Sequence, residues 1–339
     1  MKILFDHSLP FHFAHGGVQI QIEQTRAALE RIGVEVDYLR WWDAAQTGDV
    51  LHYFGRPSTF YIHFAQQKGL RVVFSELLGG MGARSPLVLL GQRLLTRGME
   101  ACLPDLIIGR NSWESFRLAD ACVALTEWEA HLMRTMFRAP NARVHVLPNG
   151  VEDVFLQSGD SPRGPWLVTT ASILPVKRIV ETARAAALAK TPYWVIGKPF
   201  SENDGYFREF LAIQRAHPET IRYEGAIADR PTLAKIYREA RGFVMLSRWE
   251  TLSISALEAA ACACPLLLSD LPWARSVFGD TVQYCPKTAT STAIARCLQA
   301  FYEAAPALQP PPRSLSWLEV AERLKELYKN VASARPLAI

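Results

Sequence analysis

Short apolar runs alternate with helix-like segments along almost the whole chain, and this alternation restricts the possible folds most strongly. Each run has the length of one strand, and the stretches between runs are long enough for a helix that crosses to the next strand. The alternation therefore predicts an α/β fold built on doubly wound parallel sheets. The predicted strands are residues 2–6, 35–39, 50–54, 71–75, 121–125, 143–147, 166–172, 193–197, 221–225, 242–246 and 265–269.

A polar stretch rich in glycine and proline interrupts the alternation at residues 158–165. Such a composition is typical of a linker between domains. A proline-rich stretch at 309–314 precedes a last amphipathic segment, 316–331, in which Ser316 and Glu319 have the spacing of a capping box. Since 339 residues are enough for two domains, we expect two Rossmann-like domains and a terminal helix.

The charge and hydropathy patterns argue against several classes of protein. The formal net charge is only +4, and no block of lysine and arginine indicates nucleic-acid binding. No apolar stretch reaches the roughly 18 residues of a membrane span, and the first residues lack the pattern of a signal peptide. We therefore expect a cytoplasmic protein with no nucleic-acid partner.

The cysteines and acidic residues give no sign of a metal site. The six cysteines have no paired C-x-x-C spacing and lie mostly in apolar segments, as expected for reduced core residues of a cytosolic protein. The chain contains no D-x-D pair and no His/Cys cluster with ligand spacing. We therefore predict neither a catalytic metal ion nor a cofactor.

One segment has a composition suited to a membrane surface. Residues 77–99 contain many leucines and three arginines but no acidic residue. A basic amphipathic helix can lie in the membrane interface, and peripheral contact with the inner face of a membrane is therefore one interpretation. A core helix with solvated arginines is the other.

Two glutamates, Glu250 and Glu258, lie on either side of seven residues that begin a helix. The apolar run 242–247 predicts a buried strand before Glu250, and the alanine-rich sequence after Ser253 predicts a helix that carries Glu258. Ligands bind at the carboxyl edge of such sheets, and a helix N-terminus there suits phosphate. Glu250 could then reach a neutral group beside the phosphate, and Glu258 could reach a diol such as a ribose. An ordinary loop glutamate and a solvated helix glutamate are the alternative interpretation.

Two further segments follow the first strands of the two predicted domains. Gly16 and Gly17 open a helix after the first strand, where they would let backbone N–H groups approach a ligand closely. Lys177 and Arg178 follow the first strand of the second domain, where they could neutralise a phosphate. A plain tight turn and solvated cations would explain the same residues.

His52 and Glu76 fall near the carboxyl ends of predicted strands in the first domain. An acceptor could bind at that edge of the sheet. A core histidine and a solvated glutamate are the alternatives.

Together and in this order, these segments resemble the retaining glycosyltransferases of family 4, which have the GT-B fold. The resemblance covers nearly the whole chain and includes LPNGV at 147–151 and ETLSISALE at 250–258. It implies two Rossmann-like domains that face a cleft. Residues 1–160 with 314–339 would form the acceptor-side domain, and 161–313 would form the nucleotide-sugar-binding domain.

The resemblance also implies roles for single residues. Glu250 would contact the transferred sugar near its reacting carbon and is the expected catalytic residue, and Glu258 would bind the ribose hydroxyls. Ser172 stands where the family usually has an arginine, so Arg178 is the candidate for the missing charge. The donor-binding set would comprise Gly16, Gly17, Lys177, Arg178, Thr251, Leu252, Ser253 and Glu258.

The activity that the resemblance implies is transfer of a sugar, with retention, from a nucleotide-diphosphate sugar to a hydroxyl group. The acceptor would be a glycan, a lipid-linked sugar or a small molecule. A nucleotide-sugar epimerase of the same fold and a non-catalytic sugar-binding protein are the alternatives. The epimerase would turn over the donor without an acceptor, and the missing arginine at Ser172 is compatible with the non-catalytic protein.

Overall fold

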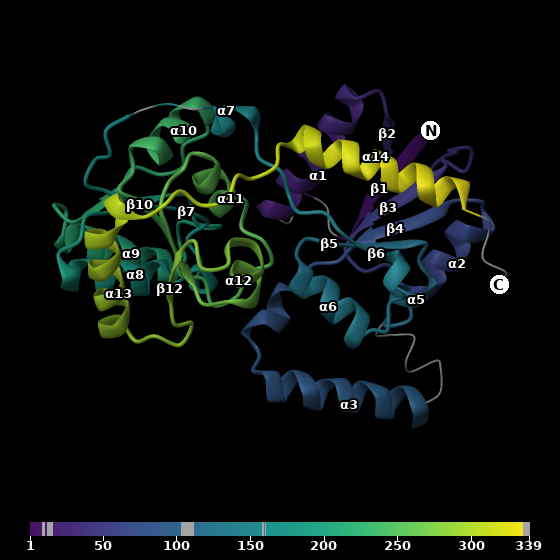
Figure 1. Ribbon diagram of the computed structural model, residues 1–339, viewed down its shortest axis with the longest axis horizontal. Coiled ribbons are helices and arrows are strands. Elements are labelled where there is room, and N and C mark those ends of the chain that lie inside the picture. The colour runs from purple at the N-terminus through teal and green to yellow at the C-terminus, as the bar shows by residue number, and fades with distance from the viewer. Residues whose placement is uncertain (9–10, 12–15, 103–111, 158, 160, 335–339) are drawn as a thin grey trace. The chain divides into compact units, whose positions relative to one another are not determined.

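The structure is a computed structural model that describes residues 1–8, 11, 16–102, 112–157, 159 and 161–334. The chain divides into two compact units (Figure 1). Unit 1 comprises residues 1–149 and 317–339, and unit 2 comprises residues 150–316. Each unit contains one six-stranded parallel sheet with flanking helices, so the predicted α/β fold is confirmed.

The boundaries of the units differ from the predicted domain boundaries. The prediction places residues 150–160 and 314–316 in the first domain. The structure places them in unit 2. Helix α7 (Asp153–Leu156) packs against α10 (Arg230–Glu239) and α11 (Ile254–Ala261), and Val151 pairs with Ser316 in a short parallel bridge. Within the predicted linker, residues 158 and 160 lie outside the described part of the chain, and residues 161–165 form a loop of unit 2, so packing rather than composition sets the boundary.

The sheet of unit 1 has the strand order β2-β1-β3-β4-β5-β6. All its pairs are parallel. The strands are β1 (Lys2–His7), β2 (Glu35–Tyr38), β3 (Val50–Phe54), β4 (Arg71–Ser75), β5 (Ala121–Ala124) and β6 (Val144–Val146). The helices are α1 (Gly17–Arg31), α2 (Thr59–Gln67), η1 (Gly79–Ala83), α3 (Pro86–Cys102), α5 (Ser115–Leu118), α6 (Glu127–Thr135), η3 (Asn141–Arg143) and α14 (Trp317–Ser333).

The two faces of this sheet have different cover. Leu4, Leu51 and Phe74 point to a core that also contains Ile62 of α2 and Met133 of α6. Helices α1 and α14 pack together, and α14 contacts β3. The last helix of the chain therefore completes unit 1, because burial of its apolar stripe needs the first sheet.

The sheet of unit 2 has the order β12-β11-β10-β7-β8-β9, also with all pairs parallel. Helices α8 and α13 pack against each other on one face. The strands are β7 (Leu167–Thr170), β8 (Tyr193–Ile196), β9 (Ile221–Tyr223), β10 (Gly242–Met245), β11 (Leu266–Ser269) and β12 (Gln283–Cys285). The helices besides α7, α10 and α11 are η4 (Pro175–Lys177), α8 (Ile179–Ala189), α9 (Gly205–Ala216), α12 (Pro272–Phe278), α13 (Ser291–Ala304) and η5 (Ala305–Ala307).

Strand β12 is the strand that the sequence pattern missed. It has three residues, Gln283, Tyr284 and Cys285, and lies at the edge of the sheet beside β11. Only Cys285 is buried, so the strand lacks the continuous apolar run of the central strands. No helix in the described part of the chain combines the length and apolar character needed to cross a membrane.

Candidate functional site

The strand order of unit 2 reverses between β7 and β10. From β7 the chain continues to β8 on one side, and from β10 it continues to β11 on the other. In open α/β sheets such a switch point creates a crevice at the carboxyl ends of the two strands. Lys177 follows β7 through η4, and Glu250 follows β10, so both come from the loops at this point.

The side chains of Lys177 and Glu250 form an ion pair, in which Nζ of Lys177 donates to Oε2 of Glu250. The backbone N–H of Arg248 donates to the carbonyl of Val176 at 2.8 Å and ties the two loops together. The Lys177 and Glu250 side chains are 22% and 15% exposed, so a ligand in solvent can reach the pair. The structure thus brings together two residues that are 73 positions apart in the chain.

Helix α11 begins at Ile254, after the short loop 251–253 that follows Glu250. Ser253 is its N-cap, and its side chain accepts a hydrogen bond from the backbone N–H of Ala256 at 3.2 Å. The backbone N–H of Thr251 donates to Oε1 of Glu250 at 3.4 Å, while Leu252 and Ser253 are buried. The first turn of a helix offers N–H groups and a partial positive charge to an anion. This turn therefore adds to the Lys177 cation at the same edge of the sheet.

Glu258 lies on the inner side of α11 and is buried. Its carboxylate pairs with the guanidinium of Arg230, and the hydroxyl of Tyr237 lies 3.5 Å from it. Arg230 also donates from Nε to Glu152 at 2.7 Å and stacks over the ring of Phe155. Burial raises the pKa of Glu258 to about 7, and the Arg230 guanidinium opposes this rise. In this structure Glu258, the residue predicted to bind the ribose, is therefore paired with Arg230 of the same unit.

Arg178 directs its guanidinium at backbone carbonyl groups of its own unit. It is the N-cap of α8, with a left-handed backbone, and its buried guanidinium donates to the carbonyls of Lys287 at 3.1 Å and Ala289 at 2.6 Å. It therefore fastens the loop after β12 to the start of α8. The structure therefore corrects the expectation that Arg178 supplies the charge of the arginine missing at Ser172. The guanidinium donors of Arg178 are directed at backbone oxygens.

Gly16 and Gly17 lie at the start of α1 in unit 1, after β1. Gly16 has φ 137°, a backbone conformation that L side chains rarely adopt, and it is the N-cap of α1. An added Cβ atom at Gly16 would meet nothing within 4 Å. Backbone conformation, rather than lack of space, therefore favours glycine here. The preceding residues 12–15 lie outside the described part of the chain.

Glu76 follows β4 and lines a hollow of about 540 Å³ at the carboxyl edge of the unit 1 sheet. Arg56, after β3, donates to its carboxylate at 3.1 Å. Burial raises the pKa of Glu76, and Arg56 opposes this rise. The lining residues are Ser8, Val18, Gln21, Phe54, Gly55, Arg56, Ser75, Glu76, Leu77 and Ser112. Seven of the ten lie at or directly after the carboxyl end of β1, β3 or β4, as expected for a binding site of a doubly wound sheet.

His52 is a core residue and does not reach this hollow. It is the third residue of β3, only 1% exposed, with Nδ1 2.5 Å from the hydroxyl of Tyr328 and Nε2 2.8 Å from the hydroxyl of Ser75. Burial lowers its pKa to about 3, so the ring is neutral. The predicted acceptor-side role of His52 is corrected: it connects α14 to the sheet, because its strand position points to the face that α14 covers.

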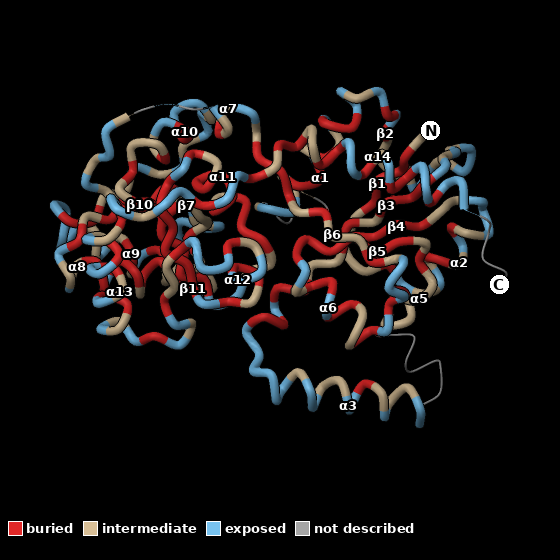
Figure 2. Tube along the Cα trace, in the orientation of Figure 1, coloured by how far each residue is buried: buried red, intermediate tan, exposed pale blue. Residues whose placement is uncertain are grey.

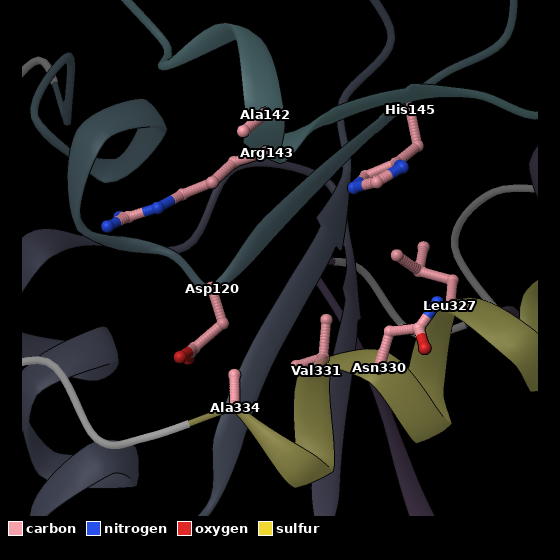
Figure 3. Close-up of a pocket in the computed structure, with 8 residues that line it drawn as sticks. All are labelled: Asp120, Ala142, Arg143, His145, Leu327, Asn330, Val331 and Ala334. Atoms are coloured by element: carbon pink, nitrogen blue, oxygen red, sulfur yellow. The ribbon is translucent and has the colours of Figure 1, made fainter.

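A second hollow of unit 1, of about 270 Å³, lies between α14 and the amino ends of β5 and β6 (Figure 3). Asp120 and Arg143 precede these strands, Asn330 lies near the end of α14, and Ala334 follows the helix. Asp120 accepts from Arg71 at 3.1 Å and from the backbone N–H of Val72 at 2.8 Å, so its carboxylate is already engaged. This hollow lies at the sheet edge opposite to the one where ligands bind in such folds.

Metal ligands do not gather in the described ranges of the chain. No group of three or more His, Cys, Asp or Glu side chains there is arranged to hold an ion. The six cysteines are free thiols. The expected cytosolic location stays a prediction.

Comparison with known proteins assigns the fold. The chain superposes on sucrose-phosphate synthase from Thermosynechococcus elongatus with a TM-score of 0.68 at 16% identity, covering 99% of this chain and 100% of that one. It superposes on Anabaena Alr3699/HepE in complex with UDP with a TM-score of 0.65 at 13% identity, covering 97% and 100%. At these identities the likeness shows the fold alone. The fold is that of the GT-B glycosyltransferases, with two Rossmann-like units.

The family model matches a segment that lies within unit 2. Residues 157–309 match the family model "Glycosyl transferases group 1". The chain is 32% identical over 177 residues to a D-inositol 3-phosphate glycosyltransferase of Jonesia denitrificans, covering 44% of this chain and 41% of that protein. It is 28% identical over 145 residues to a GDP-mannose:cellobiosyl-diphosphopolyprenol alpha-mannosyltransferase of Xanthomonas campestris, covering 39% and 36%. The chain thus matches less than half of the length of either relative.

The sequence did not predict two arginines of these sites. Arg230 pairs with Glu258, and Arg56 pairs with Glu76, although both arginines look like ordinary loop or helix-end residues in the sequence. One signal was available for Arg56, because it follows a predicted strand at the same edge as Glu76. Arg230 gave no such signal, since its partner comes from an element 28 residues away.

Proposed function

We propose that this chain is a retaining glycosyltransferase that moves a sugar from a nucleoside-diphosphate sugar to a hydroxyl group of an acceptor. The Lys177–Glu250 ion pair at the switch point of unit 2 is the observation that carries the proposal. It lies within the segment that matches the group 1 glycosyl transferases. Nucleoside diphosphates need a cation and N–H donors at such a point, and Lys177 and the first turn of α11 offer both.

The Lys177–Glu250 ion pair indicates how the donor would be accepted. Lys177 exchanges the carboxylate of Glu250 for the donor diphosphate, and Glu250 is then free to accept hydrogen bonds from hydroxyls of the sugar. The backbone N–H groups of Leu252 and Ser253 donate hydrogen bonds to the sugar and the phosphate. The Glu258 carboxylate accepts hydrogen bonds from the ribose hydroxyls while it remains paired with Arg230.

The reaction breaks the bond between the anomeric carbon and the diphosphate oxygen and forms a bond from that carbon to the acceptor oxygen. The acceptor proton passes to the leaving diphosphate, so a separate basic side chain is not needed. Positive charge develops on the sugar and negative charge on the leaving group. Lys177 and the N–H groups stabilise the departing diphosphate, and Glu250 stabilises the sugar. No step uses a metal ion.

The hollow beside Glu76 and Arg56 is the proposed acceptor side. Its serine, glutamine and charged groups suit the hydroxyls of a glycan. One relative is named for a diphosphopolyprenol acceptor, which supports a glycan on a lipid carrier as the first acceptor class to test.

The experiment has two steps. A thermal-shift screen of nucleotides and nucleotide sugars identifies the donor, because a ligand at 100 times its Kd stabilises the folded protein by about 2.7 kcal/mol. Lys177→Ala should lose this shift. The identified donor is then incubated with and without glycan acceptors, and the product linkage is read by NMR.

Each alternative has its own outcome in this experiment. Transfer with an unchanged anomeric configuration supports the proposal, and an inverted product contradicts retention. Conversion of the donor to its epimer without an acceptor would identify an epimerase. Donor binding with no turnover under any acceptor would identify a non-catalytic binding protein.

A further inference from the structure

Helix α3 of unit 1 has exposed residues along most of its length (Figure 2), and several of them are large and apolar. Thr96 is its one buried residue. Five apolar side chains of α3 are between 51% and 80% exposed: Leu87, Val88, Leu90, Leu94 and Leu95. Figure 1 shows α3 at the periphery of unit 1. A contiguous apolar patch of this kind on a soluble fold marks an interaction surface.

The exposed residues form one stripe. Leu87, Leu90 and Leu94 are three and four residues apart, as are Val88, Gly91 and Leu95, so all project from neighbouring positions on one side of the helix. Gly91 and Gly98 lie on the same side and are also exposed, and they add no polar side chain to it. We name residues 87, 88, 90, 91, 94, 95 and 98 the apolar stripe.

The opposite side of α3 carries the polar contacts. Glu100 pairs there with Arg117 at 3.0 Å and with Arg138 at 3.6 Å, and Leu89 packs against the core of unit 1. Surface helices of globular proteins normally bury their apolar side and expose their polar side. In α3 the apolar side is exposed and the polar side faces the protein. Such a surface suits a partner that buries apolar side chains.

The charges beside the stripe are positive. Residues 77–99 contain no Asp or Glu, and Arg84, Arg93 and Arg97 lie in this segment. Arg93 and Arg97 occupy successive turns at one border of the apolar stripe, and Arg84 is exposed just before the helix. The acid of α3, Glu100, is engaged on the inner side. The partner surface is therefore apolar in its interior and negatively charged at its rim.

We propose that α3 lies in the interface of an anionic phospholipid bilayer, with the apolar stripe in the acyl boundary and the arginines among the lipid headgroups. Its 17 residues span about 25 Å, and since no described helix is suited to cross the membrane, α3 lies in the plane of the surface. A second copy of the chain is the less favoured occupant, because an antiparallel two-fold contact along the stripe would bring the arginines of both copies to the same rim. This inference is independent of the transfer reaction.

The test is vesicle flotation of the full chain. We expect binding to vesicles of equal parts phosphatidylglycerol and phosphatidylcholine, and weaker binding to phosphatidylcholine alone. Leu94→Glu should lower the partition into anionic vesicles by roughly tenfold or more, because it replaces a buried apolar contact by a charge. Arg93→Gln with Arg97→Gln should lower it by about fivefold per arginine at low salt and have little effect on phosphatidylcholine alone.

Leu188→Glu is the matched control. Leu188 is 63% exposed on α8 of unit 2, close to the 60% of Leu94, so the substitution adds the same charge at equal exposure. It should leave flotation unchanged. Thermal melting of each variant establishes that it is folded.

Three outcomes would overturn the inference. The first is no flotation of the wild-type chain with anionic vesicles, and the second is equal loss in Leu94→Glu and Leu188→Glu. The third is a dimer in sedimentation without lipid that Leu94→Glu dissociates, which would make a second copy the occupant. None of these outcomes depends on sugar transfer.

Discussion

At the scale of single residues, Glu250 and Glu258 differ in surroundings although one short loop and helix carry both. Glu250 is reachable from solvent and pairs with Lys177, whereas Glu258 is only 3% exposed and pairs with Arg230. Under the proposed function Glu250 acts near the reacting carbon, and Glu258 holds a part of the donor that does not react. The two residues should therefore affect different kinetic parameters.

Glu250→Ala should lower kcat by about a hundredfold, because it removes an interaction made mainly in the transition state. Glu258→Ala should chiefly raise the donor KM, by about tenfold, because ground and transition states share the ribose contact. Steady-state kinetics with varied donor measures both. Equal effects on KM alone at both positions would contradict the assignment.

Arg230→Ala should destabilise unit 2 by about 3 kcal/mol, because it leaves the buried Glu258 carboxylate without its cation. Urea unfolding measures the loss. Arg184→Ala is the matched control, since Arg184 and Glu209 form an exposed pair whose removal should change stability by less than about 1 kcal/mol. Similar losses in both variants would show that the Arg230 pair is not special.

His52 should make unit 1 sensitive to acid. Burial holds its pKa at about 3, against 6.5 for an ordinary histidine, so below about pH 6.5 the unfolded chain binds a proton that the folded chain does not. The free energy of unfolding should therefore fall as the pH falls through this window, by at most about 1.4 kcal/mol per pH unit from this group.

The measurement is urea unfolding at pH 7, 6 and 5. His52→Gln removes the titrating ring and should flatten the slope relative to the wild type, although its stability at pH 7 is lower. Tyr328→Phe retains the ring and should retain the slope. An identical slope in the wild type and His52→Gln would show that His52 is not the acid-sensitive group.

At the scale of elements, α14 has the clearest consequence for stability. It is distant in sequence from the rest of unit 1 but packs on α1 and β3. Leu324 and Leu327 are among its buried residues. Leu324→Ala should cost about 2–5 kcal/mol of the stability of unit 1, because it leaves a cavity in a packed contact.

Urea unfolding followed by probes in each unit checks this prediction. Lys329→Ala is the control, since Lys329 is 53% exposed on the same helix and should change stability by less than about 0.5 kcal/mol. If Leu324→Ala destabilised unit 2 and left unit 1 unchanged, the assignment of α14 to unit 1 would be wrong.

At the scale of the whole molecule, the proposed reaction should be independent of divalent metal ions. In the proposed reaction, Lys177 and the first turn of α11 neutralise the diphosphate, and metal-ligating side chains do not cluster among the described residues. Turnover in EDTA should equal turnover without it. Complete loss in EDTA, with recovery on adding Mg²⁺ or Mn²⁺, would show that the diphosphate needs an ion that the proposal omits.

Local pattern determined the fold class of this protein. Eleven strands could be predicted because each is a short apolar run between helical segments, and the periodicity of a run does not depend on its neighbours in space. The same local logic placed Lys177, Glu250 and the Gly16–Gly17 turn after strand ends, where the carboxyl edge of a parallel sheet lies. Strand β12 escaped because an edge strand with one buried residue carries too little pattern.

Tertiary structure alone decided the partners of the polar side chains. Whether Arg178 binds a ligand or the carbonyls of Lys287 and Ala289 depends on a loop more than a hundred residues away, which no local pattern encodes. For the same reason His52 became a core residue through Tyr328, and Glu258 acquired Arg230. Direction also matters: the sequence of α3 predicts an amphipathic helix, but which side packs on the protein is fixed by the long-range contacts of Glu100 and Leu89. Periodicity sets which residues share a face, and only the packing of distant elements sets what that face meets.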